Sequence, residues 1–260
     1  MTIAPVSTLV RIAHRGASDA APENTMAAFR SAVAQGVDLI ETDVHRTADG
    51  VLVLVHDDHL DRTTDVATVF PDRSSTAVAD HTWDELQRLD AGSWKGSCFA
   101  GERIPSLAQF LDLLQGSRTG LLLEVKDPAL YPGIEEEIAD VFEAAEQYVE
   151  AAVAADKLVV QSFDWDFVRR FHRRLPEVPA GLLAGPGVEP PVEDAAWVAT
   201  FNPYFEAATP ELIARIHELD MRCFPWTVNA EADMRALVAA GADGVITDRP
   251  TALNEVLAGV

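Results

Sequence analysis

The chain has 260 residues, 48% of them hydrophobic and 24% charged, which is the composition of a globular protein with a large core. Its 20 Lys and Arg residues stand against 42 Asp and Glu residues, giving a formal net charge of −22. Nucleic acids are bound through clusters of basic residues, so this charge argues against a nucleic-acid partner. No apolar run approaches the roughly 20 residues of a transmembrane helix, and the first residues lack a secretory signal pattern. We therefore expect a cytoplasmic protein with a small-molecule partner.

Short apolar runs typical of strands recur along the chain, and most are separated by segments with helical periodicity. The predicted strands are 9–13, 37–44, 51–55, 120–125, 158–162, 180–184, 197–201, 222–228 and 244–247. The predicted helices include 25–35, 107–114, 134–155, 165–175, 210–219 and 231–240. Alternating strands and helices predict a parallel sheet.

The connection from 37–44 to 51–55 breaks this alternation. It is short and ends in Asp49-Gly50, a turn signal, so we expect an antiparallel hairpin there. Eight parallel strands then remain, which is the number in a closed (β/α)8 TIM barrel. An open doubly wound sheet would also alternate, but no glycine-rich phosphate loop follows the first strand. Residues 57–103 are too long for an ordinary loop and are predicted to be an insertion or lid within a single domain, 1–260.

Acidic residues share one face at the ends of two predicted strands. Residues two apart in a strand point to the same side, which groups Glu41 with Asp43, and Glu124 with Lys126. Active sites of barrel enzymes lie at the carboxyl ends of the strands. Three buried carboxylates need a counter-charge, and oxygen ligands suit Mg²⁺ or Ca²⁺ better than zinc. The pattern predicts a divalent metal site.

Histidines follow two of the predicted strands, in Ala13-His14-Arg15-Gly16 and in Val55-His56-Asp57. A histidine can serve as general base or general acid near neutral pH. Arg15 and Lys126 are candidates for binding phosphate oxygens. Trp226 either packs in the core or forms an apolar wall of the substrate pocket. The remaining histidines are expected on the surface: His45, His59, His81, His172 and His217.

Taken together, these segments resemble the glycerophosphodiester phosphodiesterase family. The resemblance runs through nearly the whole chain, in stretches that include Ala13-His14-Arg15-Gly16, Pro22-Glu23-Asn24-Thr25, Ile40-Glu41-Thr42-Asp43-Val44, Val55-His56-Asp57, Arg62-Thr63-Thr64, Leu123-Glu124-Val125-Lys126, Gln161-Ser162-Phe163, Pro225-Trp226-Thr227-Val228-Asn229 and Ile246-Thr247-Asp248-Arg249-Pro250. For Asn24, the simplest interpretation is a cap of the helix that begins at Thr25.

The resemblance implies a (β/α)8 barrel with an insertion and a hydrolase of glycerophosphodiesters that yields an alcohol and glycerol 3-phosphate, with a place in lipid and glycerol metabolism. It also implies a divalent metal on Glu41, Asp43 and Glu124, and catalytic His14 and His56, with phosphate contacts from Arg15 and Lys126. Two alternatives stay open: a phospholipase D-like enzyme acting on lysophospholipid or sphingolipid head groups, and a non-catalytic phosphodiester-binding barrel. The aromatic residues of the insertion, Trp94 and Phe99, are expected to contact the alcohol half of the substrate.

Overall fold

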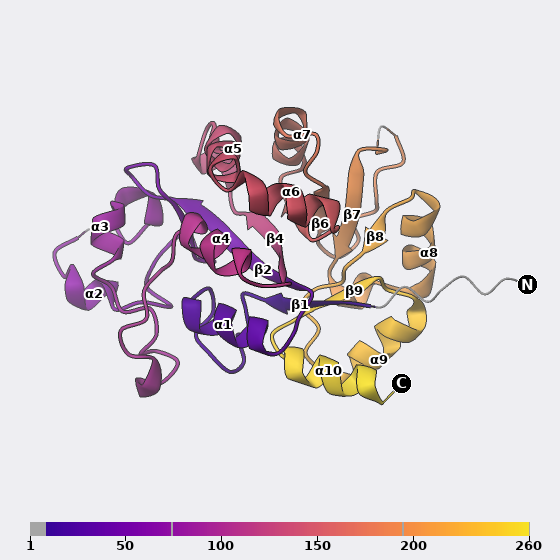
Figure 1. The fold of residues 1–260 in the computed structure, drawn as a ribbon, viewed down its shortest axis with the longest axis horizontal. Coiled ribbons are helices and arrows are strands. Elements are labelled where there is room, and N and C mark those ends of the chain that lie inside the picture. Colours follow the sequence, from indigo (N-terminus) through magenta and orange to yellow (C-terminus); the bar gives the residue numbers. More distant parts are fainter. Residues whose placement is uncertain (1–8, 74, 194, 260) are drawn as a thin grey trace, which may run out of the picture.

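A computed structural model describes residues 9–73, 75–193 and 195–259, and it contains a ring of strands surrounded by helices (Figure 1). The strands are β1 (Val10–His14), β2 (Leu39–Arg46), β3 (Leu52–Leu54), β4 (Gly120–Val125), β5 (Leu158–Ser162), β6 (Ala180–Ala184), β7 (Val198–Pro203), β8 (Arg222–Cys223) and β9 (Gly244–Thr247). Their neighbours along the sheet follow the order β8-β7-β6-β5-β4-β2-β1-β9, with β3 paired only to β2. Every pairing is parallel except β2 with β3, which confirms the predicted hairpin.

The two ends of this sheet approach each other and nearly close the barrel. Past the end of β8, backbone hydrogen bonds join the chain to β9 and its preceding residue: Asp243 N to Cys223 O at 3.1 Å, Ile246 N to Pro225 O at 3.1 Å, and Val228 N to Ile246 O at 2.9 Å. The predicted strand 222–228 is recognised only at Arg222–Cys223. Pro225 has no N–H to offer a regular ladder, which accounts for the shortened strand. The eight parallel strands confirm the predicted TIM barrel.

The chain has α-helices around the outside of this ring and in the segment that follows β3. They are α1 (Met26–Ala34), α2 (Val66–Val69), α3 (Trp83–Leu86), α4 (Leu107–Gln115), α5 (Ile134–Ala144), α6 (Glu146–Ala154), α7 (Trp165–Arg174), α8 (Pro210–Glu218), α9 (Glu231–Ala240) and α10 (Pro250–Ala258). Single 3₁₀ turns are η1 (Val78–Asp80), η2 (Ser97–Phe99), η3 (Pro128–Leu130) and η4 (Phe205–Ala207). The predicted helix 134–155 is divided at Ala145, and α10 was not predicted, although Pro250 stands at a favoured first helical position.

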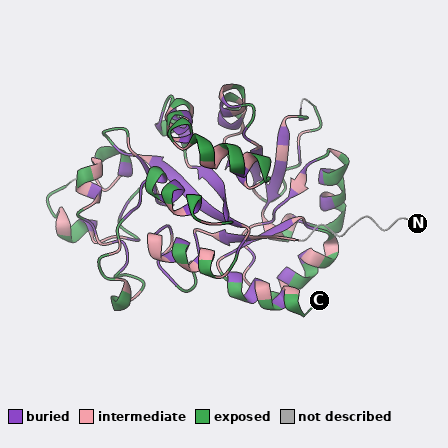
Figure 2. Cartoon of the chain, in the orientation of Figure 1, coloured by how far each residue is buried: buried purple, intermediate pink, exposed green. Residues whose placement is uncertain are grey.

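Two apolar layers hold the barrel together. Inside the ring, a small cluster plugs the barrel and contains Ile12, Leu39, Leu122, Val159, Phe224 and Ile246. The alternate residues of the same strands, such as Ile40 and Leu123, face outward and pack in the main core with the inner faces of the helices. Figure 2 shows this arrangement, with buried strands and with helices exposed on their outer sides. The inner plug ends below Glu41 and Glu124, so the acidic residues lie above it at the carboxyl ends of their strands.

The segment 57–103 leaves the barrel after β3 and contains the short helices α2 and α3, which lie at one end of the molecule in Figure 1. It has an apolar cluster of its own, built on the outer part of β3: Val53, Val55, Leu60, Val66, Val78, Leu86, Leu89, Ala91 and Ile104. The chain rejoins the barrel where Leu54 N donates to Pro105 O at 2.9 Å.

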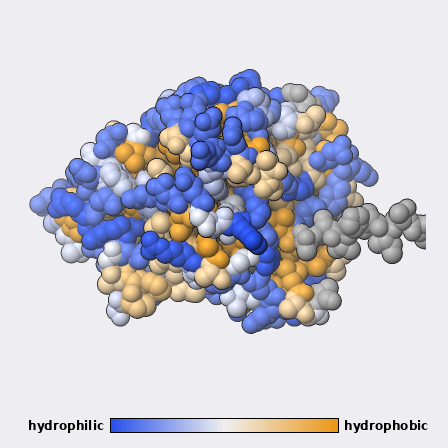
Figure 3. Space-filling view, in the orientation of Figure 1, coloured by the Kyte–Doolittle hydropathy of each residue, from blue (hydrophilic) through white to orange (hydrophobic). Residues whose placement is uncertain are grey.

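Hydrophilic side chains cover most of the face shown in Figure 3, as the charge of the chain requires. Within the described part of the chain, no helix has the length and apolar character needed to cross a membrane.

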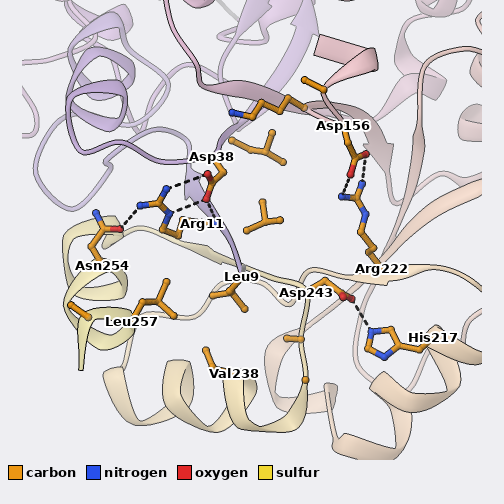
Figure 4. Close-up of a pocket in the computed structure, with 17 residues that line it drawn as sticks. Leu9, Arg11, Asp38, Asp156, His217, Arg222, Val238, Asp243, Asn254 and Leu257 are labelled. Atoms are coloured by element: carbon orange, nitrogen blue, oxygen red, sulfur yellow. Dashed lines mark hydrogen bonds and ion pairs between the residues drawn. The ribbon is translucent and has the colours of Figure 1, made fainter. Parts of the chain in front are cut away.

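A cavity of about 1160 Å³ lies at the amino ends of the strands, and Figure 4 shows most of its charged side chains paired with one another. These pairs are Arg11 with Asp38, Arg222 with Asp156, and His217 with Asp243. In TIM barrels this end contributes to stability rather than to catalysis.

Candidate active site

Three carboxylates from two neighbouring strands meet above the inner plug. The register of β2 and β4 sets Asp43 opposite Glu124, and Glu41 lies two residues earlier on the same face. One oxygen from each carboxylate can be chosen so that all three lie within 4.8 Å of one another. All three residues are buried. The structure therefore brings together the three acidic residues predicted to bind metal.

The carboxylates influence one another strongly because little water reaches them. Burial, followed by the charges of Asp43 and Glu124, raises the pKa of Glu41 well above its usual range. Burial and the charge of Asp43 raise the pKa of Glu124 to about 7. Burial also disfavours the charged form of Asp43, but Arg15 and Lys126 outweigh it and hold the pKa of Asp43 below its usual range. The cluster thus has a surplus of negative charge that Arg15 and Lys126 outweigh at Asp43 but offset only in part at Glu41 and Glu124.

The residues present fit a divalent cation. Among the described residues, Glu41 Oε1 and Asp43 Oδ1 are buried oxygens that accept no hydrogen bond. A buried polar atom without a partner is costly, and an oxygen-only donor set is the one that Mg²⁺ and Ca²⁺ prefer. Both the orphaned oxygens and the surplus charge would be compensated by the same ion.

Arg15 and Lys126 flank Asp43 from two sides. Arg15 Nε lies 3.3 Å from Asp43 Oδ2, and Lys126 Nζ lies 3.6 Å from Asp43 Oδ1. Lys126 also donates to Glu124 Oε1 at 2.7 Å, while Arg15 donates to Glu23 Oε1 at 2.7 Å. Burial lowers the pKa of Lys126, but the adjacent Asp43 and Glu124 outweigh it, so the ammonium group stays charged.

The backbone after β1 turns sharply to position Arg15. Arg15 has a φ of 55°, a left-handed conformation that is uncommon for a residue with a side chain, and Gly16 follows with a φ of 82°. A Cβ atom on Gly16 would come within 2.7 Å of the backbone of Ala28, so only glycine fits. This turn directs the Arg15 backbone N–H to Glu41 Oε2 at 2.9 Å.

Each of the two predicted catalytic histidines is held by a carboxylate. His14 Nδ1 lies 2.6 Å from Asp248 Oδ1, and His56 Nδ1 lies 2.6 Å from Asp57 Oδ1. Arginine and histidine contacts outweigh the effect of burial on Asp57 and lower its pKa to about 2, so this carboxylate is ionised at neutral pH. Burial lowers the pKa of His56, and the neighbouring Asp43 and Asp57 only partly offset it. Both rings thus have a carboxylate on Nδ1, and Nε2 of His56 lies 3.1 Å from Lys126 Nζ.

Two cavities meet beside His56. The inner one, of about 120 Å³, is lined by both histidines, Glu41 and Trp226 among others. Trp226 is held by a hydrogen bond from Nε1 to Asn202 O at 2.8 Å, so it is a wall of this cavity as well as part of the interior packing. The outer cavity, of about 810 Å³, lies towards η3 and the start of α7. Both are lined by His56, Glu124, Lys126 and Phe163.

Comparison with known proteins agrees with this geometry. The model of the glycerophosphoryl diester phosphodiesterase family matches residues 14–252. The chain belongs to this family. It is 37% identical over 251 residues to a glycerophosphodiester phosphodiesterase from Caldanaerobacter subterraneus subsp. tengcongensis, covering 95% of this chain and 97% of the relative.

Solved structures of phosphodiesterases share the fold over nearly their full length. A putative glycerophosphoryl diester phosphodiesterase from Silicibacter pomeroyi superposes with a TM-score of 0.84 at 32% identity, covering 98% of this chain and 95% of the other. A phosphodiesterase from Oleispira antarctica, in complex with the product sn-glycerol-3-phosphate, gives a TM-score of 0.83 at 29% identity, covering 95% and 96%. The chain is therefore an enzyme, a glycerophosphodiester phosphodiesterase.

Two histidines expected on the surface of this phosphodiesterase are buried. His45 lies in β2, where Nδ1 is 2.9 Å from the Tyr131 hydroxyl and Nε2 is 3.1 Å from the backbone oxygen of His56. His81 Nδ1 lies 2.9 Å from Ala77 O. The expectation was wrong because it treated both histidines as turn residues, whereas β2 continues to Arg46 and His81 is buried within the insertion, beside the ring of Phe70. His45 fixes the backbone that carries His56.

The predicted role of Asn24 was also wrong. Thr25 caps α1, and Asn24 instead donates from Nδ2 to Asp43 Oδ2 at 2.8 Å and accepts from the Thr42 hydroxyl at 2.7 Å. Asn24 therefore belongs to the support of the acidic cluster. Its positive φ of 54° directs it there, a conformation for which asparagine is favoured.

Sequence reasoning assigned no role to the residues that hold the side chains predicted to be catalytic. Arg62, from the insertion, contacts Asp57 Oδ2 at 2.5 Å and both oxygens of Glu23 at 2.8 and 2.9 Å. Glu23 in turn accepts from Arg15. The two carboxylates that hold the histidines could have been found from the sequence. Asp57 directly follows His56, and Asp248 directly follows β9, at the same end of the barrel.

Proposed function

We propose that the enzyme hydrolyses a glycerophosphodiester to an alcohol and glycerol 3-phosphate, with Mg²⁺ or Ca²⁺ bound by Glu41, Asp43 and Glu124. The observation that carries the proposal is the buried cluster of three carboxylates, with orphaned oxygens, between two carboxylate-held histidines. A bound divalent cation would supply a Lewis acid that neutralises phosphate charge. The product named for the Oleispira antarctica structure supports glycerol 3-phosphate as the product here.

Arg15 and Lys126 bind the phosphate oxygens. Both cations line the inner cavity on either side of Asp43. Charge-assisted hydrogen bonds from these groups oppose the negative charge that develops as the diester reacts. Trp226 forms the apolar wall against the carbon atoms of the glycerol half.

His14 acts as the general base and His56 as the general acid. The inner cavity is small and suits the constant glycerol phosphate half, whereas the alcohol varies in size and needs the wider outer cavity. His56 lines both cavities, and His14 lines the inner one. A proton donor for the departing alcohol oxygen must stand where the alcohol leaves, which supports His56 for this role.

We propose that residues 57–103 form an insertion within a single domain, 1–260; Asp57 of this insertion lines the outer cavity and accepts a hydrogen bond from Arg62. All five predicted metal and histidine residues are present, which argues against a non-catalytic binding barrel. From this substrate chemistry we infer a role in lipid and glycerol metabolism. A cytoplasmic location stays a prediction from the sequence.

Phosphorus NMR tests this function directly. The enzyme is incubated with a mixture of glycerophosphodiesters and lysophospholipids, with Mg²⁺, with Ca²⁺ and with excess EDTA. We expect glycerol 3-phosphate to appear from the diesters only when a metal is present. Full activity in EDTA would contradict the metal requirement. Turnover confined to lysophospholipids would instead favour the phospholipase D-like alternative.

A further inference from the structure

The outer cavity is where the departing alcohol must lie if the proposed function is correct. It opens directly from the reacting site, because His56, Glu124 and Lys126 line it as well as the inner cavity. Its volume of about 810 Å³ can accommodate alcohols of different sizes. The chemistry of its remaining lining residues should therefore decide which alcohol the enzyme prefers.

Carboxylates line the outer part of this cavity. Asp58, Asp127 and Asp164 come from three different segments of the chain and face the same space. The only ammonium group among the described lining residues, that of Lys126, is engaged by Glu124 at 2.7 Å and faces the reacting site. A positively charged alcohol would be attracted into this space, and one carrying an extra negative charge would be repelled.

Two exposed apolar side chains stand among these carboxylates. Phe163 is 48% exposed and Leu130 is 55% exposed, and both line the outer cavity. They are two of the five large hydrophobic residues that are exposed in the described chain. The Phe163 ring is positioned by an edge contact with Trp226, with 5.4 Å between centroids and an interplanar angle of 85°. Large apolar groups left open to solvent beside a reacting site are suited to contact a ligand.

We propose that the outer cavity is a subsite for a cationic alcohol such as choline or ethanolamine, with Phe163 beneath the ammonium group and Asp58, Asp127 and Asp164 around it. An aromatic face next to carboxylates is the arrangement that recognises substituted ammonium ions. This inference rests on the proposed function, since it concerns the alcohol half of the same substrate. It makes Phe163 a specificity-determining residue.

The aromatic residues of the insertion do not share this role. Trp94 and Phe99 line neither the inner nor the outer cavity. Trp94 Nε1 instead donates to Ala91 O at 2.9 Å within its own loop. The expectation that these two residues contact the alcohol is therefore replaced by the assignment to Phe163. Trp94 is 42% exposed, close to the exposure of Phe163, which makes it a matched control.

Competition between two diesters that share the glycerol phosphate half and differ in the alcohol tests the subsite. Glycerophosphocholine and glycerophosphoglycerol are mixed in equal amounts, and phosphorus NMR gives the ratio of their kcat/KM values. We expect the wild-type enzyme to favour the choline diester, and Phe163→Ala to lower the ratio about two- to fivefold, the range of a lost cation–π contact. Trp94→Ala should leave the ratio unchanged.

Charge variants test the carboxylates separately. Asp127→Asn suits the left-handed φ of 40° at this position, and Asp164→Asn retains a residue able to cap α7. Each should lower the ratio by a few fold at low ionic strength, and added salt should reduce the wild-type preference. Asp140→Asn, on the exposed side of α5, removes the same charge away from the cavity and should have no effect on the ratio.

An unchanged ratio in Phe163→Ala, Asp127→Asn and Asp164→Asn would overturn the subsite, whatever the overall activity. Failure of the wild-type enzyme to hydrolyse any diester would count against the proposed function instead. In that case calorimetry with choline chloride decides about the subsite: binding that weakens in Phe163→Ala supports it, and no binding to the wild-type enzyme overturns it.

Discussion

His14 and His56 are arranged as two similar carboxylate–histidine pairs on opposite sides of the acidic cluster. His14 Nε2 lies 4.0 Å from Glu41 Oε2, and His56 Nε2 lies 3.1 Å from Lys126 Nζ. In each pair the carboxylate on Nδ1 fixes the tautomer and the ring orientation, as second partners of functional histidines commonly do. Asp248 and Asp57 are thus positioning residues for the two proposed catalytic groups.

Removing either ring tests the proposed roles. His14→Ala and His56→Ala should each lower kcat by about 10²-fold or more, the usual contribution of a general acid or base. A substrate with a nitrophenyl leaving group needs little protonation, so His56→Ala should recover much of its rate on it and His14→Ala should not. Steady-state rates on both substrates measure this. Recovery by His14→Ala instead would reverse the assignment of acid and base.

Asp57→Asn should change the pH profile. The hydrogen bond from His56 to the Asp57 carboxylate raises the pKa of His56 against the larger effect of burial. Its loss lowers that pKa further, and a general acid works only while it is protonated. The alkaline limb of kcat/KM should therefore move to lower pH in Asp57→Asn. Profiles of kcat/KM from pH 5 to 9 measure the shift. If the alkaline limb did not move, Asp57 would not control the pKa of His56.

The sequence predicted which side chains come together at the acidic cluster better than it predicted the residues that support them. Glu41, Asp43, Glu124 and Lys126 follow from two-residue periodicity, a local property of each strand. The contact between Arg62 and Glu23 joins residues 39 positions apart in two irregular segments. No periodic pattern encodes such a contact, because it depends on how the insertion folds back over the first turn of the barrel.

Among the elements, buried strands were predicted with the best precision. β4, β5 and β6 have the predicted bounds, and every residue of these three strands is buried. β8 was predicted too long because its apolar run continues through Pro225, where no regular ladder can form. The hydrophobicity of this segment indicates that its residues are buried, but it does not indicate which backbone hydrogen bonds they make.

The insertion depends on one carboxylate for much of its order. Asp90 accepts backbone hydrogen bonds from Gly92, Ser93 and Gly101 at 2.7 to 2.8 Å, and a further one from the Ser93 hydroxyl at 2.8 Å. Burial opposes ionisation, but these bonds outweigh it and hold the pKa of Asp90 below its usual range. A carboxylate with a lowered pKa contributes stability above its unfolded-state pKa of about 3.9, and this contribution is lost as the pH falls.

Asp90→Ala should open the loop from Gly92 to Gly101 at neutral pH, at a cost of about 1–3 kcal/mol for the lost charge-assisted bonds. Limited proteolysis should then cut within this loop, while amide exchange of the barrel strands stays slow. The difference from the wild-type protein should shrink below about pH 4, because protonation of Asp90 in the opened loop progressively cancels the contribution of these bonds. Asp84→Ala, an exposed position on α3, serves as control. Equal cleavage of both variants would contradict the role of Asp90.

At the scale of the whole molecule, the two ends of the barrel differ in how their charges are balanced. At the amino end, acidic and basic side chains form pairs, as in Arg11 with Asp38 and Arg222 with Asp156. At the carboxyl end, three buried carboxylates share the charges of Arg15 and Lys126, and Arg15 is also bound by Glu23. The carboxyl end of the barrel therefore has negative charge that is not fully compensated, which destabilises the fold until a cation is bound.

Metal binding should accordingly stabilise the whole fold. A ligand that binds only the native state at a hundred times its Kd adds about 2.7 kcal/mol, which raises the Tm of a domain of this size by about 5 to 10 °C. Thermal unfolding in EDTA and in millimolar Mg²⁺ or Ca²⁺ measures the rise. Glu41→Gln keeps the shape of the side chain but cannot become a carboxylate ligand, so it should reduce the metal-induced rise in Tm. Glu255→Gln, an exposed position on α10, should behave like the wild-type protein. If Glu41→Gln kept the full metal-induced rise in Tm, Glu41 would not be a metal ligand and the cation would be bound elsewhere.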